Sequence, residues 1–536
     1  MPSLSFWLLS LLSTSSSVFA SPTRTLPRNS GSPFVTASPG GLVANGSKFS
    51  FIGTNAYWLP YLNSDDDISN TLANMSASGI NVVRTWAFND VTTIPEAGSW
   101  LQLIANGTAT INTGPNGLQR LDKLVELAAQ QNIHVILSLT NNWNPTADLS
   151  ASHSPVRRNE VSPTPFPRNF LSNDYGGMDA YVREFSDTKA HDEFYTDQTI
   201  RKFFEQYIQA VVSRFVNNPR VLAWELANDP RCNSTLPSSE SCNTNTITRW
   251  HADIAKFIRS IDPNHLISSG NHGFFCPSCP KLFFNPLPPP QPSSAPGGTR
   301  KRTAGGITPS KLLRMITEER RAAPRALDSR DGVKIRGRWM ASLIPIAEAK
   351  RQTSGVGPAF DGSFGVDSLD ILSIPNIDFG SFQLFPDQNS YGTIATQFTP
   401  PSVNLNETVQ QGIAWIQAQA ASAKAVDKPL ALIGFGLVTQ VNLQSFVPFN
   451  ATSPVVTPPP QNQKRKSSLG TFGTGVTDQQ RDSAYASWLQ AGIQAGLSGL
   501  SQYQPANGTF VQSSSGAGTL GVSPNDGYGI IGCVIT

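Results

Sequence analysis

Charged side chains are scarce in this sequence, at 14% of 536 residues, and cysteine and histidine occur only five and six times. No glycine-rich phosphate loop opens any of the expected helices, which disfavours a nucleotide-binding sheet. After the N-terminal segment, no stretch is long and apolar enough to span a bilayer. The cysteine spacing fits no zinc finger, and no other cluster suggests a metal site.

The net charge of +3 hides an uneven distribution. Between Arg300 and Arg351, fourteen Lys and Arg residues face five Asp and Glu residues, so that segment carries +9 and the remainder carries 3 − 9 = −6. The folded body is therefore expected to be mildly acidic, which argues against a nucleic-acid partner. Hydrophobic residues at 39% and ten tryptophans allow a substantial core.

The first residues have the pattern of an export signal. Residues 1–20 contain the apolar run Phe6-Trp7-Leu8-Leu9 and end in Val18-Phe19-Ala20, a small-residue cleavage pattern. A Ser/Pro-rich spacer, 21–34, follows, which favours a removed signal over a buried N-terminal helix. The sequence thus predicts a secreted, extracellular protein that is not held in a membrane.

Glycosylation and disulfide signals agree with secretion. Seven Asn-x-Ser/Thr tripeptides begin at Asn45, Asn74, Asn106, Asn233, Asn406, Asn450 and Asn507. Cys232 and Cys242 bracket a polar loop and are predicted to form a disulfide. Cys276 and Cys279 could pair with each other, or one of them could pair with Cys533. In either case one cysteine remains.

Short β-rich apolar runs alternate with helix-patterned segments, which predicts a parallel α/β architecture. The expected strands are 49–58, 81–88, 134–143, 221–229, 265–273, 381–387, 429–437 and 496–504. The expected helices between them are 67–78, 117–131, 199–217, 248–261, 408–425 and 477–495. Eight strands with intervening helices predict a (β/α)8 barrel, with an open doubly wound sheet as the alternative.

Three segments interrupt this alternation and are predicted to be flexible insertions in a single barrel spanning 35–536. They are the Pro/Ser-rich loop 144–172, the proline-rich and then strongly basic stretch 284–352, and 453–476. Residues 311–323 could form a short basic helix within the second insertion. A solvated loop is the simpler interpretation of that composition.

Two carboxyl groups about 5–5.5 Å apart would be needed for retaining glycoside hydrolysis. In a barrel, such groups lie at the C-terminal ends of strands. The run Trp224-Glu225-Leu226-Ala227-Asn228-Asp229-Pro230 resembles a strand that carries a proton donor. With period-2 alternation, Glu225 and Asp229 share a face, but Glu225 lies deeper and is expected to belong to a structural polar layer.

Seven motifs occur in the order found in fungal endo-β-1,4-mannanases of glycoside hydrolase family 5. They are Gly53-Thr54-Asn55-Ala56-Tyr57-Trp58, Val83-Arg84-Thr85-Trp86, Asp174-Tyr175-Gly176-Gly177-Met178-Asp179, His191-Asp192-Glu193-Phe194-Tyr195, Trp224-Glu225-Leu226-Ala227-Asn228-Asp229-Pro230-Arg231, Ile377-Asp378-Phe379-Gly380 and Pro524-Asn525-Asp526-Gly527-Tyr528. The chain resembles this family over most of 35–533, apart from the insertions. The resemblance implies a (β/α)8 barrel, β-mannan or a related plant cell-wall polysaccharide as substrate, a monomer, and neither metal nor cofactor.

The chain departs from the family pattern at both catalytic positions. The resemblance implies a Glu acid/base where this chain has Asp229, whose carboxyl is one methylene shorter. It implies a Glu nucleophile where this chain has Gly434, which has no side chain that could form a glycosyl-enzyme. Misplacement of a reacting group by about an ångström is costly to rate, and a missing nucleophile is worse.

Further departures surround the same expected cleft. A His-x-Tyr pattern on strand six is replaced by Gln383 and Phe385, a strand-eight Trp by Ser501, and a strand-five Glu by His272. The retained residues are Arg84 and Asn228, with Trp58, Trp86 and Trp143 as sugar platforms or, equally, barrel core. Arg84 is interpreted as a hydrogen-bond donor near the reacting centre, with a structural salt bridge as the alternative. His272 could act as a new base, although a lone His is more often a hydrogen-bonded structural side chain.

Three functions are consistent with this pattern. By resemblance the chain is a mannan endo-1,4-β-mannosidase, but we expect hydrolysis to be absent or severely reduced. The alternatives are a carbohydrate-binding pseudoenzyme and an inert remnant of a duplicated gene. A weak inverting hydrolase would remain possible if Asp229 acted with Glu225 or Asp387 as base.

Overall fold

The computed structural model describes residues 32–145, 168–284, 333–335, 338–340, 358–388, 404–454, 475–503 and 526–529. The predicted signal peptide, most of the spacer, the 311–323 segment, Asn507 and Cys533 lie outside these residues. The predicted insertions 144–172, 284–352 and 453–476 are described only at their edges and in two short strands.

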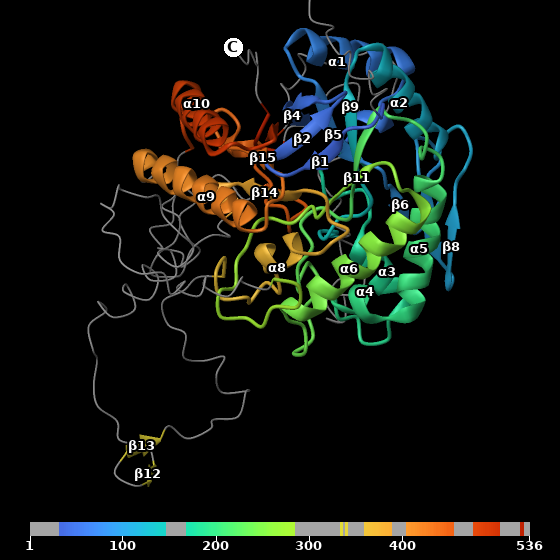
Figure 1. Cartoon of the computed structure of the whole chain (residues 1–536). Coiled ribbons are helices and arrows are strands. Elements are labelled where there is room, and N and C mark those ends of the chain that lie inside the picture. Colours follow the sequence, from blue (N-terminus) through green and yellow to red (C-terminus); the bar gives the residue numbers. More distant parts are fainter. Residues whose placement is uncertain are drawn as a thin grey trace, which may run out of the picture.

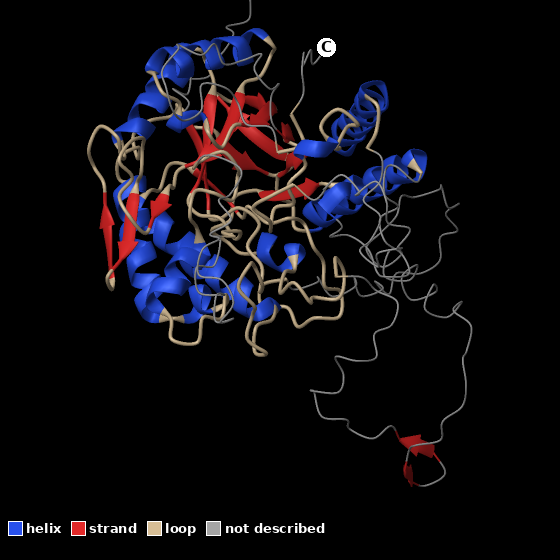
Figure 2. Cartoon of the chain, turned by 180° about the vertical axis from the view of Figure 1, so that it is seen from behind, coloured by secondary structure: helices blue, strands red, loops and turns tan. Residues whose placement is uncertain are grey.

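Eight parallel strands form the centre of the molecule, as Figures 1 and 2 show. They are β4 (Phe51–Asn55), β5 (Val82–Trp86), β9 (His134–Ser138), β10 (Val221–Glu225), β11 (Leu266–Ser268), β14 (Gly380–Leu384), β15 (Leu430–Phe435) and β16 (Gly499–Tyr503). Their order in the sheet is β11-β10-β9-β5-β4-β16-β15-β14. A parallel bridge between Ser268 and Phe379 joins the two ends, so the sheet is a nearly closed (β/α)8 barrel.

The helices lie around this sheet, outside the strands (Figure 2). They are α1 (Asp65–Ala77), α2 (Gln119–Gln130), α3 (Met178–Phe185), α4 (Glu193–Thr196), α5 (Gln198–Val212), α6 (Thr244–Ile261), α8 (Ser368–Leu372), α9 (Leu405–Ala425) and α10 (Asp478–Ala495), with 3-10 turns at Leu59–Tyr61, Pro386–Gln388 and Leu443–Ser445. Helix α10 shows how the sequence sets an end, because Thr477 and Gln480 form a capping box and Gly496 at φ 79° ends the helix.

Small sheets complete the described chain. The strands β1 (Thr36–Ser38), β2 (Gly41–Ala44) and β3 (Ser47–Phe49) form an antiparallel meander, and β6 (Asp90–Val91), β7 (Gln102–Ala105) and β8 (Thr108–Ile111) form a second sheet after β5. A third pair, β12 (Val333–Ile335) and β13 (Arg338–Met340), lies inside the predicted basic insertion. Among the helices of the described ranges, none is long and apolar enough to cross a bilayer.

Apolar side chains fill the lower barrel interior. Leu42 of the β1–β3 meander packs with residues from the strands, and Phe51 and Ile433 belong to the same buried cluster. The much larger cluster lies between the sheet and the surrounding helices. This division leaves the carboxyl ends of the strands for polar side chains.

Most of the fold was predicted correctly from periodicity. All eight strands and six of the helices lie where the sequence predicts them, with shifts of a few residues at their ends. The helices α3, α4 and α8 were missed because they have only 8, 4 and 5 residues. Periodicity is not informative over so few residues.

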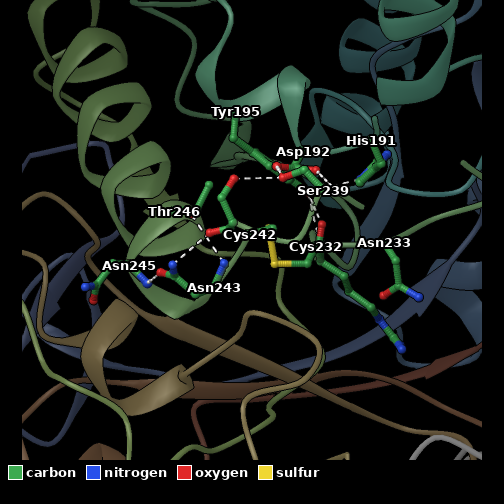
Figure 3. Close-up of a disulfide and its surroundings, with 12 residues drawn as sticks. His191, Asp192, Tyr195, Cys232, Asn233, Ser239, Cys242, Asn243, Asn245 and Thr246 are labelled. Carbon is green, nitrogen blue, oxygen red and sulfur yellow. Dashed lines mark hydrogen bonds between the residues drawn. A yellow bond between two sulfur atoms is a disulfide. The ribbon is translucent and has the colours of Figure 1, made fainter. Parts of the chain in front are cut away.

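Two disulfides each close a short loop. Cys232 pairs with Cys242, as predicted, and Cys276 pairs with Cys279 rather than with Cys533. Figure 3 shows the first disulfide beside Asp192, whose carboxylate accepts hydrogen bonds from the backbone and hydroxyl of Ser239 at 2.6 Å each. Both disulfides contact one segment, because side chains at Gly362 and Gly365 would overlap Cys279 and Cys232, respectively.

Gly499→Ala should destabilise the barrel, because a Cβ at residue 499 would overlap the Phe51 ring inside the sheet. Overpacking of this kind costs about 1–3 kcal/mol. Gly41→Ala is the matched control, since its Cβ would meet Ser498 at an ordinary 3.9 Å. Urea unfolding should show a lower midpoint for the first variant only, and equal midpoints would contradict the packing described.

Candidate functional site

A pocket lies at the carboxyl ends of the barrel strands, where barrel enzymes bind their substrates. Its lining consists of Asn55, Arg84, Trp86, Asn141, Trp143, Ser172, Asn173, Asn228, Gln383, Phe385, Gly434, Phe449 and Tyr503. None of these residues is an aspartate, a glutamate or a histidine. Only about 10 Å³ is open to the centre of a water molecule, which is room for about one water.

A buried ion pair forms the floor of this pocket. Arg84, 3% exposed, donates from Nε to Glu225 Oε2 at 2.8 Å and from Nη2 to Glu225 Oε1 at 2.5 Å. Glu225 is therefore the structural polar group that the sequence predicts. Arg84 forms the salt bridge given above as its alternative role, and its Nη2 also donates to Asn228 Oδ1 at 2.8 Å in the pocket wall.

The amide of Asn55 links this ion pair to strand β15. Its Oδ1 accepts from Arg84 Nη1 at 2.7 Å, and its Nδ2 donates to the carbonyl of Ile433 at 2.7 Å. The β14–β15 register shifts here, so that Gln383 pairs with Gly434 and Ile433 is the extra residue. This bulge turns both Ile433 and Gly434 towards the barrel interior.

Asp229 lies outside the residues that line the pocket. Its carboxylate, 1% exposed, forms a salt bridge with Arg231 at 2.8 Å and accepts a hydrogen bond from Trp143 Nε1 at 3.0 Å. Its backbone is left-handed, at φ 55°, a conformation that Asp tolerates better than most residues. Asp229 is thus turned towards Arg231.

The charges around Asp229 keep it ionised. Burial acts to raise the pKa of Asp229, but Arg231 and then His272 outweigh it and hold the pKa well below its ordinary value. A general acid needs the opposite shift, because it must hold a proton at the working pH. Asp229 is therefore poorly suited to donate one.

His272 belongs to this ion-pair cluster and does not line the pocket. Its Nδ1 lies 3.5 Å from Asp229 Oδ1, and its ring stacks on Phe274 at 4.9 Å. Burial lowers the pKa of His272, and Asp229 partly opposes that shift. Phe274 and Phe364 also hold the guanidinium of Arg231, each with its centroid 4.6 Å away.

Gly434 lies in the pocket wall. Its backbone does not require glycine, since its φ is outside the left-handed region. A Cβ there would meet Phe385 Cζ at 3.2 Å and Asn55 Nδ2 at 3.5 Å. The space of a side chain at residue 434 is thus partly filled by the Phe385 ring.

Gln383 and Phe385 both line the pocket, as predicted for the end of strand six. Gln383 Nε2 donates to Asn228 Oδ1 at 3.1 Å, and Asn228 Nδ2 donates to Asn141 Oδ1 at 2.8 Å. Phe385 contacts Tyr503 edge-on at 5.1 Å. The polar groups of the wall therefore bind one another.

Besides Asp229 and His272, two other predicted site residues do not line the pocket. Trp58 is fully buried in the hydrophobic core and is not among the residues that line the pocket. Ser501 packs against Gly53 one layer below the pocket, and Tyr503, two residues later, lines it instead. Trp86 and Trp143 do line it. In the part of the chain that is described, no His, Cys, Asp or Glu cluster could hold a metal ion.

The comparisons with known proteins agree with this barrel. A family model described as GH family 5 beta-mannosidase-like matches residues 32–284. A mannan endo-1,4-beta-mannosidase A from Aspergillus aculeatus is 30% identical over 390 residues, which are 73% of this chain and 70% of that protein. The chain belongs to glycoside hydrolase family 5, among its β-mannosidase-like members.

Other members of this family match over shorter lengths. Mannan endo-1,4-beta-mannosidase A from Podospora anserina is 40% identical over 236 residues, covering 44% of this chain and 53% of that protein. Mannan endo-1,4-beta-mannosidase F from Aspergillus fumigatus is 37% identical over 45% of this chain and 49% of that protein. The chain thus spans about half the length of these two relatives.

The solved structure of another protein has the same fold as this GH5 chain. The endo-1,4-beta-mannanase from Rhizomucor miehei superposes with a TM-score of 0.57 at 23% identity, covering 93% of this chain and 94% of that one. At this identity the likeness concerns the fold alone.

The sequence patterns did not reveal the roles of Arg231 and Tyr503 in this site. Arg231 lies within the motif that ends the fourth strand, but its pairing with Asp229 depends on loop geometry that spacing does not reveal. Tyr503 lines the pocket, and its hydroxyl donates to Asp526 Oδ2 at 3.0 Å. Only its two-residue spacing from Ser501 could have indicated this position.

Arg231→Met should destabilise the fold by about 3–5 kcal/mol at neutral pH, because the Asp229 charge would be buried without its partner. Asp229→Asn in the same chain should recover part of that loss. The pKa of Asp229 is lowered on folding, so its contribution is present above the unfolded value of about 4 and fades as pH falls towards the folded value. Urea unfolding of both single variants and the double variant measures the coupling. Strictly additive losses would contradict a direct ion pair.

Asp526→Asn should flatten the dependence of stability on pH. Burial raises the pKa of Asp526 to about 7, although the Tyr503 hydroxyl partly opposes the shift. The folded state thus keeps a proton that the unfolded chain releases above about pH 4, so stability falls as pH rises to about 7.

Asp90→Asn is the matched comparison, because burial raises the pKa of Asp90 to about 8. The loss of stability due to Asp90 should therefore continue to about one pH unit higher than the loss due to Asp526. Unfolding free energies measured from pH 4 to 9 test both variants. A wild-type slope in the Asp526→Asn variant would contradict a protonated carboxyl.

Proposed function

We propose that this GH5 protein is a secreted, mannanase-like barrel that does not hydrolyse β-mannan at an appreciable rate. One observation carries the proposal: no carboxylate lines the pocket at the carboxyl ends of the strands, within the described residues. Retaining and inverting glycosidases both need two carboxyl groups across the scissile bond.

The acid/base position supports this proposal. Asp229 is the residue that the resemblance puts there, and its two oxygens accept from Arg231 Nε at 2.9 and 3.0 Å. A carboxylate held in this way neither reaches the pocket nor carries a proton. Its chemistry is therefore that of a structural anion.

The nucleophile position supports it equally. Gly434 offers no side-chain atom to attack a sugar, and the two carboxylates considered as substitutes, Glu225 and Asp387, have other partners. Glu225 is paired with Arg84 at 2.5 Å, and Asp387 accepts from the backbone of Val438 at 3.0 Å without lining the pocket. These contacts disfavour the inverting alternative in which Asp229 would act with one of them.

Carbohydrate binding without turnover is the second candidate function. Trp86, Trp143 and Tyr503 present aromatic surface in the pocket, and amides from Asn173 and Gln383 lie beside them. The pocket has room for about one water, so a sugar ring would require it to open.

The purified, secreted protein should release reducing ends from β-mannan at least about 10³-fold more slowly than an active relative, because the reacting groups act as a unit and both are compromised. The Podospora anserina protein serves as the active comparison. Viscosity loss of a mannan solution gives a second readout. Turnover comparable to that of the relative would overturn the proposal.

Two variants test whether inactivity comes from the missing carboxylates or from the small size of the pocket. Asp229→Glu with Gly434→Glu should stay inactive while folded, because Phe385 still crowds residue 434 and Arg231 still pairs with residue 229. Adding Phe385→Ala opens space in the pocket wall.

Calorimetry with manno-oligosaccharides on the unaltered protein distinguishes a binding protein, which gives saturable heat, from an inert remnant, which gives none.

A further inference from the structure

The Asn-x-Ser/Thr tripeptides differ in what their asparagines do in the fold. Of the six that lie in the described chain, Asn74 is partly buried, and Asn45, Asn106, Asn233, Asn406 and Asn450 are exposed. An exposed asparagine whose side-chain amide makes no hydrogen bond, and whose backbone conformation does not require asparagine, can carry a modification without disturbing the fold. The structure therefore allows four of the exposed ones, Asn45, Asn106, Asn233 and Asn450, to be compared.

Two of the exposed asparagines have a task in tight turns. Asn45 and Asn106 stand at φ 51° and 53°, each followed by a glycine at positive φ, in the two-residue connections β2–β3 and β7–β8. Asn-Gly is the preferred pair for such turns. Their presence is thus explained by backbone conformation alone.

Asn233 has no comparable task. Its backbone carbonyl accepts from Asn142 Nδ2 at 3.2 Å, whereas its exposed side-chain amide makes no hydrogen bond among the described residues (Figure 3). The next residue, Ser234, is anchored through its hydroxyl to the Asn142 carbonyl at 2.5 Å and to Asp179 at 2.8 Å. This anchor and the Cys232 disulfide hold the loop with Asn233 and Thr235 exposed to solvent.

Asn450 is presented in the same way from another loop. The backbone on either side is held, because Asn173 Nδ2 donates to the carbonyls of Phe449 at 2.7 Å and Ala451 at 2.9 Å. The side chain of Asn450 is exposed and, within the described part, makes no hydrogen bond. Thr452, the hydroxyl residue of the tripeptide, is partly exposed.

Both positions border the candidate pocket. Phe449 lines it directly, and Asn142, which holds the Asn233 carbonyl, lies between the lining residues Asn141 and Trp143. The two loops follow β15 and β10, which are not neighbours in the sheet. We propose that Asn233 and Asn450 are N-glycosylation sites whose oligosaccharides stand beside the pocket mouth.

The covalent step needs a lipid-diphosphate-linked oligosaccharide, the donor used in the secretory compartment. The asparagine amide nitrogen bonds to the first sugar's anomeric carbon, the bond from that carbon to the diphosphate oxygen breaks, and the amide loses one proton. The lipid diphosphate leaves with the bonding electrons. The modification adds a bulky, solvated group at the surface, and it is independent of whether the chain hydrolyses mannan.

The test uses the full chain secreted from yeast. Release of N-glycans by an amidase in heavy-oxygen water converts each occupied asparagine into a labelled aspartate, which peptide mass spectrometry locates. We expect the label at Asn233 and Asn450 in most molecules. Asn233→Gln and Asn450→Gln should each lower the intact mass by one glycan.

Matched variants separate glycan attachment from other effects. Thr235→Ala and Thr452→Ala should remove the same glycans although the asparagines remain, whereas Thr235→Ser should keep the first one. Asn63→Gln, an exposed asparagine outside any such tripeptide, should leave the mass unchanged. Secreted protein without label at either asparagine would overturn the proposal, as would a chain that never enters the secretory compartment.

Discussion

The buried pair of Arg84 and Glu225 is the constraint on which the upper half of the barrel depends. A lone charge in this interior would be very costly, so each side chain requires the other, and the remaining guanidinium donors need acceptors as well. Asn55 and Asn228 supply them at 2.7 and 2.8 Å. One arginine therefore ties strands β4, β5 and β10 together and orients the amides that continue around the pocket wall.

A second ion pair, Asp229 with Arg231, repeats this arrangement at the strand ends. Here the guanidinium is enclosed by aromatic rings, with the Trp143 centroid at 5.2 Å and those of Phe274 and Phe364 at 4.6 Å. Burial among these rings acts to raise the pKa of Asp229, but the close charge of Arg231 outweighs this effect and keeps the carboxylate ionised. The physical effect that stabilises the loops also removes the proton that acid catalysis would need.

The parts of this structure that follow from short-range pattern were predictable, and those that follow from loop contacts were not. The eight strands and the structural role of Glu225 come from alternation along single segments. The burial of Trp58 and the pairing of Arg231 depend on how separate segments meet in space. The Cys276–Cys279 disulfide was one of several pairings left open by the sequence, although the two residues are only three positions apart.

The packing beside Gly434 constrains which side chain residue 434 could carry. Its backbone would accept other residues, and a Cβ there would meet Phe385 Cζ at a tight 3.2 Å. Phe385 in turn contacts Tyr503, Phe449 and Tyr528 at 5.1–5.3 Å. Closely packed aromatic rings resist displacement, because moving one ring opens a void beside the others. A larger side chain at residue 434 would therefore press on Phe385 and, through Phe385, on this aromatic cluster.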